Sequence, residues 1–303
     1  MKSRASFKSH RKAVSLLMSV CFIAVTATAA FAQSGKCSFQ TLNFPAPANR
    51  LPSPRALNDL GAIVGSYFGG NTSHGFLFYQ GHLASFMFPG SIRTEAWDIS
   101  RTGIIVGTYN VSGVAGTRAF MVKSGVFHQI KIPGFLSTNT SAFGVNANGD
   151  VVGRFVSNGA AFGYLLRNGK LTILSFPGAT AGTTPTSIND QGVVVGNYVV
   201  SFGAPEHAFM WKDGVFSNIS PPDNTTAEAS KISNTGVVVG SYVSPSDGLR
   251  HGFSFENGTY TKIDISPTVG SLIDAVNKFD NVIAEKIEGS VDPLFKGFCS
   301  AAF

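Results

Sequence analysis

The chain has 303 residues, of which only 13% are charged, and it contains 34 glycines and 26 phenylalanines. So few charges and so many aromatic side chains exclude an intrinsically disordered chain. Five of the 23 basic residues and none of the 17 acidic ones lie in the first 32 residues, so the rest of the chain carries a formal charge of only +1. We therefore expect no nucleic-acid partner, because binding of that kind needs a basic surface.

The first 32 residues have the three parts of a secretory signal peptide. Basic residues open the segment, residues 13–29 are apolar and uncharged, and Ala30-Phe31-Ala32 places small residues where signal peptidase reads the chain. We predict cleavage before Gln33, a periplasmic or secreted product, and a single domain over residues 33–303. The alternative is a membrane anchor. The apolar run is short for one and rich in Ala, Ser and Thr, so we expect no integral membrane span in the mature chain.

One sequence unit recurs along the rest of the chain. Its core, Ile-Asn-x-x-Gly-x-Val-Val-Gly-x-Tyr, is clearest from Ile188 to Tyr198. The small residue after the valine pair recurs every 42–46 residues, at Gly65, Gly107, Gly153, Gly196, Gly240 and Ala284. A period near 44 residues is typical of the four-stranded blades of a β-propeller.

Each copy divides into four expected strands. The first ends at the Ile-Asn or Ile-Ser pair, a glycine-containing turn follows, and the Val-Val-Gly-x-Tyr segment forms the second. A longer connection leads to the third strand. A two-residue turn such as Asn257-Gly258 then begins the fourth strand, which runs to a proline such as Pro177. Sustained helical periodicity is absent outside the leader, so the predicted fold class is all-β.

The two ends of the chain complement each other. Residues 37–45 resemble the fourth strand of a unit, and residues 296–299 resemble a third strand that lacks its fourth. We therefore predict a six-bladed β-propeller whose last blade is closed by the N-terminal strand, which leaves no open sheet edge. Cys37 and Cys299 fall on the two closing strands, and we expect a disulfide between them in an oxidising compartment. Two unpaired buried thiols are the alternative.

The third strands begin with related tripeptides. His207-Ala208-Phe209 is one of them, and His74-Gly75-Phe76 and His251-Gly252-Phe253 differ from it only by glycine for alanine. With the Ile-Asn-x-x-Gly-x-Val-Val-Gly signature, this pattern resembles the bacterial extracellular HAF-repeat family, which is named for the tripeptide. The resemblance covers nearly all of residues 37–299. It implies export and a propeller-like array, and it implies no catalytic residue.

Two groups of residues look like metal sites but are predicted to be structural. His74, His207 and His251 occupy equivalent positions in different blades, so they lie around a circle and cannot converge on one ion. We expect a repeated structural role for them, such as a hydrogen bond to a neighbouring loop. Residues 146–150 resemble a calcium loop but lack the distal glutamate and fill the position of a tight turn. We expect no metal and no other cofactor.

Charged residues on or near the innermost strands are the candidates for chemistry, because these strands converge on the central channel. They are Arg55, Glu95, Asp98, Glu228, Lys231 and Asp274. The acidic members are candidate paired carboxylates for sugar chemistry, with Glu95 and Asp98 as the first choice. The basic members are candidate groups for holding a substrate carboxylate. The alternative is that all six merely line a solvated channel.

Trp97 lies on one of the same innermost strands. It is a candidate stacking platform for a sugar, with Arg55 and Phe143 beside it, or else a core residue between two blades.

The short turns and the longer connections lie on opposite faces of the predicted propeller. Variable loops on a rigid scaffold are the usual place for a site, so we place any ligand on the face that carries the longer connections, the loop face. No catalytic triad, phosphate loop or nucleotide fingerprint is present. We expect a monomeric binding or scaffold module for an extracellular glycan or protein. Two alternatives stay open: a carbohydrate lyase or hydrolase that uses Glu95, Asp98 and Arg55, and a structural protein of the envelope.

Overall fold

The computed structural model consists of short antiparallel strands, and the described residues contain no helix. The description covers residues 39–41, 51–69, 71–137, 139–221, 226–265, 270–278, 281–287 and 296–300. These ranges all belong to one compact unit of the chain, Phe31–Phe303. The predicted signal peptide, residues 1–32, and Cys37 lie outside the described residues. Within the described part there is no helix of the length and apolar character that a membrane span requires.

Three stretches of the described chain each form a sheet of four consecutive antiparallel strands. Their strands are β10 (Asn139–Val145), β11 (Val151–Ser157), β12 (Ala160–Arg167) and β13 (Lys170–Leu174); β14 (Gly182–Ile188), β15 (Val194–Val199), β16 (Glu206–Lys212) and β17 (Val215–Asn218); and β18 (Ala227–Ile232), β19 (Val238–Val243), β20 (Arg250–Glu256) and β21 (Thr259–Ile263).

The chain before these sheets forms two more four-stranded meanders that join into one sheet. Ser73 in β4 and Arg93 in β6 make the parallel bridge that joins them. The strands are β2 (Leu51–Leu57), β3 (Ile63–Gly69), β4 (Thr72–Tyr79) and β5 (His82–Phe86), followed by β6 (Arg93–Ile99), β7 (Ile105–Asn110), β8 (Arg118–Lys123) and β9 (Val126–Ile130).

The remaining sheet combines the two ends of the chain. Its order is β1 (Phe39–Thr41), β24 (Lys296–Ser300), β23 (Asn281–Ile287) and β22 (Gly270–Val276). Phe39 pairs with Cys299 and Thr41 with Gly297, antiparallel. The prediction that the N-terminal strand supplies the fourth strand of the last sheet is therefore confirmed.

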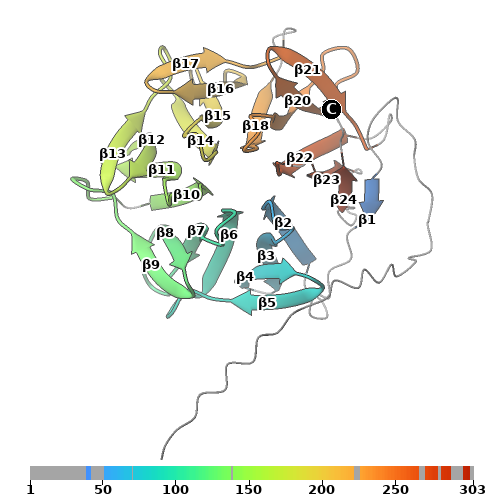
Figure 1. The fold of residues 1–303 in the computed structure, drawn as a ribbon. Coiled ribbons are helices and arrows are strands. Elements are labelled where there is room, and N and C mark those ends of the chain that lie inside the picture. The colour runs from blue at the N-terminus through green and yellow to red at the C-terminus, as the bar shows by residue number, and fades with distance from the viewer. Residues whose placement is uncertain are drawn as a thin grey trace, which may run out of the picture. The chain divides into compact units, whose positions relative to one another are not determined.

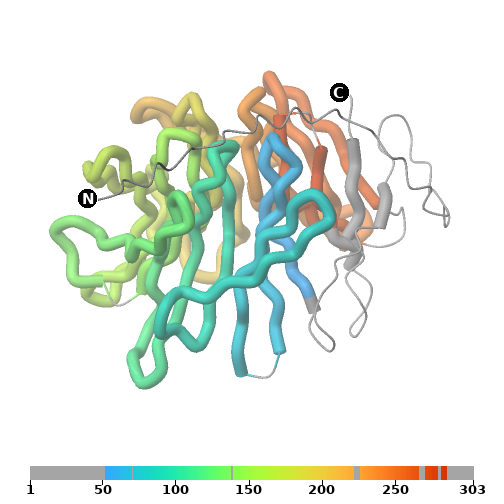
Figure 2. Tube along the Cα trace, turned by 60° about the horizontal axis from the view of Figure 1, so that its bottom comes forward, coloured from blue at the N-terminus to red at the C-terminus, as the bar shows by residue number. Residues whose placement is uncertain are grey.

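The first strand of each meander faces a common centre (Figure 1). These innermost strands, β2, β6, β10, β14, β18 and β22, each lie beside the next, and β22 lies beside β2. Figure 2 shows the sheets from another side, with the chain reversing at both ends of each one. The architecture is all-β and propeller-like.

A β-bulge in each innermost strand explains the glycine of the repeat. In β6 the pairing with β7 shifts between Ala96 and Asp98. A Cβ atom on Gly107, opposite the bulge, would lie 2.0 Å from the carbonyl oxygen of Glu95 and 2.8 Å from the ring of Phe120. The glycine thus lets the bulged backbone and a buried phenylalanine ring, which is 0% exposed, approach each other.

The third-strand histidines have the repeated structural role that the sequence predicts. Each ring contacts that of the tyrosine directly across the strand pair, stacked in the first sheet and tilted in the other two. The ring centroids are 5.4 Å apart for Tyr67–His74, 5.4 Å for Tyr198–His207 and 5.6 Å for Tyr242–His251. No group of three metal-ligating side chains able to hold an ion occurs among the described residues.

Candidate functional site

The structure has a cavity of about 50 Å³ at the common centre, lined by the last residues of the innermost strands and by the turns that follow them. These turns lie on the face opposite the longer connections. The sequence analysis placed a ligand on the loop face, so this cavity is at the other end of the channel. A volume of this size holds about one or two water molecules.

Asparagine side chains join neighbouring turns around the cavity. Asn189 Oδ1 accepts hydrogen bonds from the backbone N–H groups of Gln191 and Val193, at 3.1 and 2.9 Å. Its Nδ2 donates to the carbonyl oxygen of Ser233 in the next turn, at 3.3 Å. Asn58, Asn146 and Asn277 donate in the same way to Ser100, Asn189 and Asn58. The first asparagine of the repeat therefore both shapes its own turn and ties it to the next.

Replacing Asn189 tests this double role. Asn189→Ala removes one donor and the acceptor of two N–H groups, and we expect the free energy of unfolding to fall by about 2–3 kcal/mol. We expect about half that loss for Asn189→Ser, because Ser100 and Ser233 hold the equivalent position and accept one N–H each. Urea unfolding measures both. Equal losses of unfolding free energy for the two variants would contradict the double role of Asn189.

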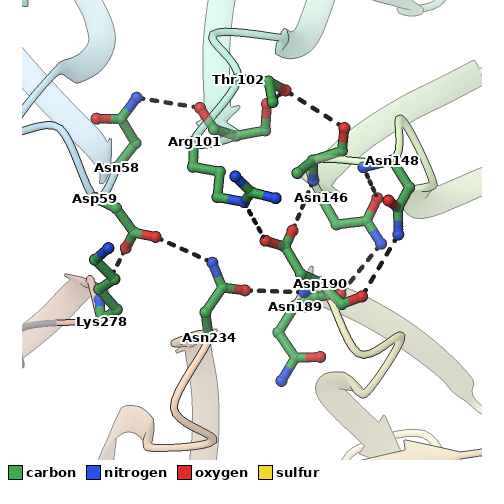
Figure 3. Close-up of polar contacts among 12 residues, drawn as sticks. Asn58, Asp59, Arg101, Thr102, Asn146, Asn148, Asn189, Asp190, Asn234 and Lys278 are labelled. Atoms are coloured by element: carbon green, nitrogen blue, oxygen red, sulfur yellow. Dashed lines mark hydrogen bonds and ion pairs between the residues drawn. The ribbon is translucent and has the colours of Figure 1, made fainter.

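A second layer of polar contacts covers the same turns (Figure 3). Arg101 Nε lies 2.7 Å from Asp190 Oδ2, and the N–H of Asp190 donates to Asn234 Oδ1 at 2.9 Å. Asn234 in turn donates to Asp59 Oδ2 at 3.1 Å, and Asp59 Oδ1 accepts from the N–H of Lys278 at 2.9 Å. These groups satisfy one another's hydrogen-bonding capacity. The face that carries the turns between first and second strands is therefore held together by its own polar side chains.

A buried ion pair crosses the channel at the cavity. Lys231 in β18 and Asp98 in β6 are 8% and 7% exposed, and their charged atoms are 3.0 Å apart. Lys231 Nζ also donates to the carbonyl oxygens of Trp97 and Phe143, both at 3.2 Å, so its three donors are all used. Asp98 Oδ2 accepts from the N–H of Val145 at 2.9 Å. The arrangement braces the channel and leaves no donor on Lys231 for a substrate.

The other predicted site residues have separate partners. Glu95 accepts a hydrogen bond from Ser73 Oγ at 3.4 Å. The Arg55 guanidinium lies 4.8 Å from the centre of the Trp97 ring. Of Glu95, Asp98 and Arg55, Asp98 alone lines the cavity. The contacts of Glu95, Asp98 and Arg55 thus lead to different partners, and their catalytic role stays a prediction.

Trp97 and Asp274 complete the predicted set. Trp97 donates through Nε1 to Thr108 Oγ1 at 3.3 Å, and its ring meets Phe143 edge-on at 5.3 Å. Arg55 lies over the face of the ring, and Trp97 is half-buried, so the stacking role stays a prediction. Asp274 lies at the bulge of β22, between Ile273 and Ala275.

A charged cluster on the loop face joins Glu228 to two residues that the sequence analysis missed, Glu206 and Arg250. Arg250 NH1 lies 3.0 Å from Glu228 Oε1. Burial raises the pKa of Glu206, and the Glu228 carboxylate raises it further, while Arg250 acts in the opposite direction. The sequence feature that could have revealed this cluster is its spacing. Glu206, Glu228 and Arg250 follow one another at 22-residue steps, half a repeat, so they alternate between third and first strands.

The loop face also carries the most exposed large apolar side chains. Leu136, before β10, is 94% exposed, and Phe202, before β16, is 93% exposed. Other exposed apolar residues on the same face are Phe68, Ile92, Val114, Phe135 and Val200. Burial of such side chains is favourable by about 1.5–3 kcal/mol each, so their exposure favours a surface that is covered by another molecule.

Comparison with known proteins gives similarity of fold. No family model matches the chain, and no curated protein matches it. An acylaminoacyl peptidase solved with a chloromethyl ketone is 14% identical with a TM-score of 0.52, over 80% of this chain and 43% of that one. The acylaminoacyl peptidase of Pyrococcus horikoshii is 12% identical with a TM-score of 0.52, over 80% of this chain and 42% of that one. The chain thus spans less than half of either peptidase, and at these identities the likeness concerns the fold alone.

A third solved structure covers more of both chains. It is a virginiamycin B lyase from Staphylococcus aureus in complex with quinupristin, which is 11% identical with a TM-score of 0.49 and matches over 88% of this chain and 100% of that one.

Proposed function

We propose that the chain is an exported, closed six-bladed propeller of the HAF-repeat type that binds a protein partner on its loop face. The pairing of β1 with β24, and the contact between β22 and β2, support closure. The proposed Cys37–Cys299 disulfide would add a covalent link at the same sheet, where Phe39 is the residue opposite Cys299.

The exposed apolar side chains of the loop face carry the proposal. Leu136 and Phe202 are almost fully exposed, on loops that belong to different sheets. The opposite face also has exposed apolar side chains, Val215, Leu60 and Val126, but none is as fully exposed, and hydrogen bonds join its first-to-second-strand turns. Large apolar side chains that enter pockets of a partner dominate the binding energy of many protein interfaces. The loop face therefore has the anchors that a binding surface needs.

The charged cluster favours a particular kind of partner. Glu206 and Glu228 face a single arginine, Arg250, so the fully ionised cluster has a net charge of −1. Burial and the Glu228 carboxylate both raise the pKa of Glu206, so its negative charge is disfavoured despite Arg250. A lysine or arginine of a partner, next to apolar residues, would supply the missing positive charge. We therefore propose a partner segment that is basic and apolar.

A peptide array tests this function. We expect saturable binding of the purified chain to apolar peptides that contain lysine or arginine, and weaker binding to acidic peptides of the same length. Phe202→Ser and Leu136→Ser should each weaken binding by about tenfold or more. Glu206→Gln should reduce the preference for basic peptides.

Leu60 provides the matched control, because it is 65% exposed but lies in a turn on the opposite face. Leu60→Ser should leave binding unchanged. An equal loss with Leu60→Ser, or saturable binding that is confined to a glycan array run alongside, would overturn the proposal.

One observation keeps a carbohydrate-active enzyme as a second candidate. A carboxyl group with a raised pKa, such as Glu206, near a second carboxyl group, such as Glu228, resembles the acid and base pair of glycosidases. In that case Glu206 and Glu228 would replace Glu95 and Asp98 as the catalytic carboxylates. Turnover of a glycan that is abolished by Glu206→Gln would support the enzyme.

A further inference from the structure

The loop of residues 244–249 joins β19 to β20 on the loop face and is folded by its own hydrogen bonds. The N–H of Ser244 donates to the carbonyl oxygen of Leu249, and the N–H of Gly248 donates to that of Ser244, both at 2.9 Å. The N–H of Leu249 donates to Asp247 Oδ1 at 2.9 Å. The side chain that connects this loop to the sheet is His251.

The His251 ring lies between two carboxylates and is 2% exposed. Its Nδ1 is 3.0 Å from both carboxylate oxygens of Asp264, which follows β21. Its Nε2 is 3.0 Å from Asp247 Oδ2, in the loop. The ring thus links the loop to the outer edge of the sheet.

Each of the two carboxylates has a further neighbour that favours its negative charge. Lys262 Nζ lies 3.0 Å from Asp264 Oδ2 and stabilises its negative charge. The pKa of Asp247 is lowered, chiefly by the N–H of Leu249, with a further contribution from His251. A carboxylate can only accept hydrogen bonds, so each ring nitrogen of His251 must donate one. Only the imidazolium form has two N–H groups.

We propose that protonated His251 clamps the 244–249 loop to the sheet and releases the loop when one ring proton is lost. In the neutral ring, one nitrogen presents a lone pair to a carboxylate, and the two repel. The other neighbours do not replace the missing positive charge: Lys262 contacts Asp264, Arg250 pairs with Glu228, and the Tyr242 ring, tilted against that of His251 at 5.6 Å, is uncharged. This proposal concerns the loop itself and stands whether or not a partner binds there.

Hydrogen exchange of the purified chain tests the clamp. The reporters are the amides of Ser244 and Gly248, with rates corrected for the intrinsic effect of pH on exchange. Between about pH 6 and about pH 9, a range that spans histidine but not lysine titration, we expect their protection to fall by about tenfold or more. In His251→Gln the protection should be low at both values of pH.

His207 is the matched control, because its ring makes the same tilted contact with Tyr198, and its buried Nδ1 has no hydrogen-bond partner among the described residues. His207→Gln should leave protection of residues 244–249 and its pH dependence unchanged. The ¹⁵N shifts of wild-type His251 at pH 7 provide a readout that needs no variant, and we expect both nitrogens to be protonated. A neutral ring at pH 7, or equal wild-type protection at both pH values, would overturn the proposal even where His251→Gln does not fold.

Discussion

Asp98→Asn is expected to lower the free energy of unfolding by about 3–5 kcal/mol, the usual effect of removing one partner of a buried ion pair. The ammonium of Lys231, 8% exposed, would then keep only neutral acceptors in a site that water barely reaches. Urea unfolding of the purified chain measures the loss. The double variant Asp98→Asn with Lys231→Met should lose less than Asp98→Asn alone, because no buried charge remains uncompensated.

The ion pair of Arg101 and Asp190 serves as a comparison on the same face. Its atoms are even closer, 2.7 Å apart, but the Arg101 side chain is 54% exposed. Solvent screening makes such a pair worth at most about 1 kcal/mol, so Arg101→Gln should have little effect. If Asp98→Asn were no more destabilising than Arg101→Gln, the pair with Lys231 would not brace the channel.

Gly240→Ala is the second substitution with a large expected effect. The added Cβ would lie 2.0 Å from the carbonyl oxygen of Glu228 and 2.9 Å from the ring of Phe253, so backbone and core must both shift. We expect a loss of about 3 kcal/mol, at the upper end for overpacking. Thermal or urea unfolding measures the loss directly.

The last repeat supplies the reverse experiment. Ala284 occupies the position of Gly240 in β23 and is 0% exposed, opposite Ile273. The alanine is accommodated there, so Ala284→Gly should cost only about 0.5–1 kcal/mol, through backbone entropy. A mild effect of Gly240→Ala, similar to that of Ala284→Gly, would show that the bulged strand yields easily and that the glycine is not a steric requirement.

The features that repeat within the chain were predictable from the sequence. The turn at Asn257-Gly258 has positive φ at both residues, 48° and 82°, as the type I′ assignment requires. The pairing of the N-terminal strand with β24 follows from comparing the chain ends with complete repeats. These predictions succeed because each depends on local chemistry that recurs several times, so that one copy explains another.

The features that differ between repeats were not predictable in the same way. Lys231 and Asp98 lie 133 residues apart, and the repeat pattern does not tell which side chains meet across the centre. The sequence indicated that both belong to innermost strands, but it gave them separate roles. Glu206 was missed because it begins a third strand, whereas only the first strands were expected to converge on the central channel. Glu228, whose carboxylate helps to raise the pKa of Glu206, was identified as a candidate, but Glu206 was not.

The hydrogen bond from Asn277 to the carbonyl oxygen of Asn58 connects the final turn to the initial one. Arrays of repeats arranged in a line can fray, because their outermost members have a neighbour on one side only. Here every such turn has a neighbour on both sides. Loss of order in any single repeat therefore weakens two junctions at once, and heating should melt all the repeats in one cooperative transition rather than peel them away in sequence.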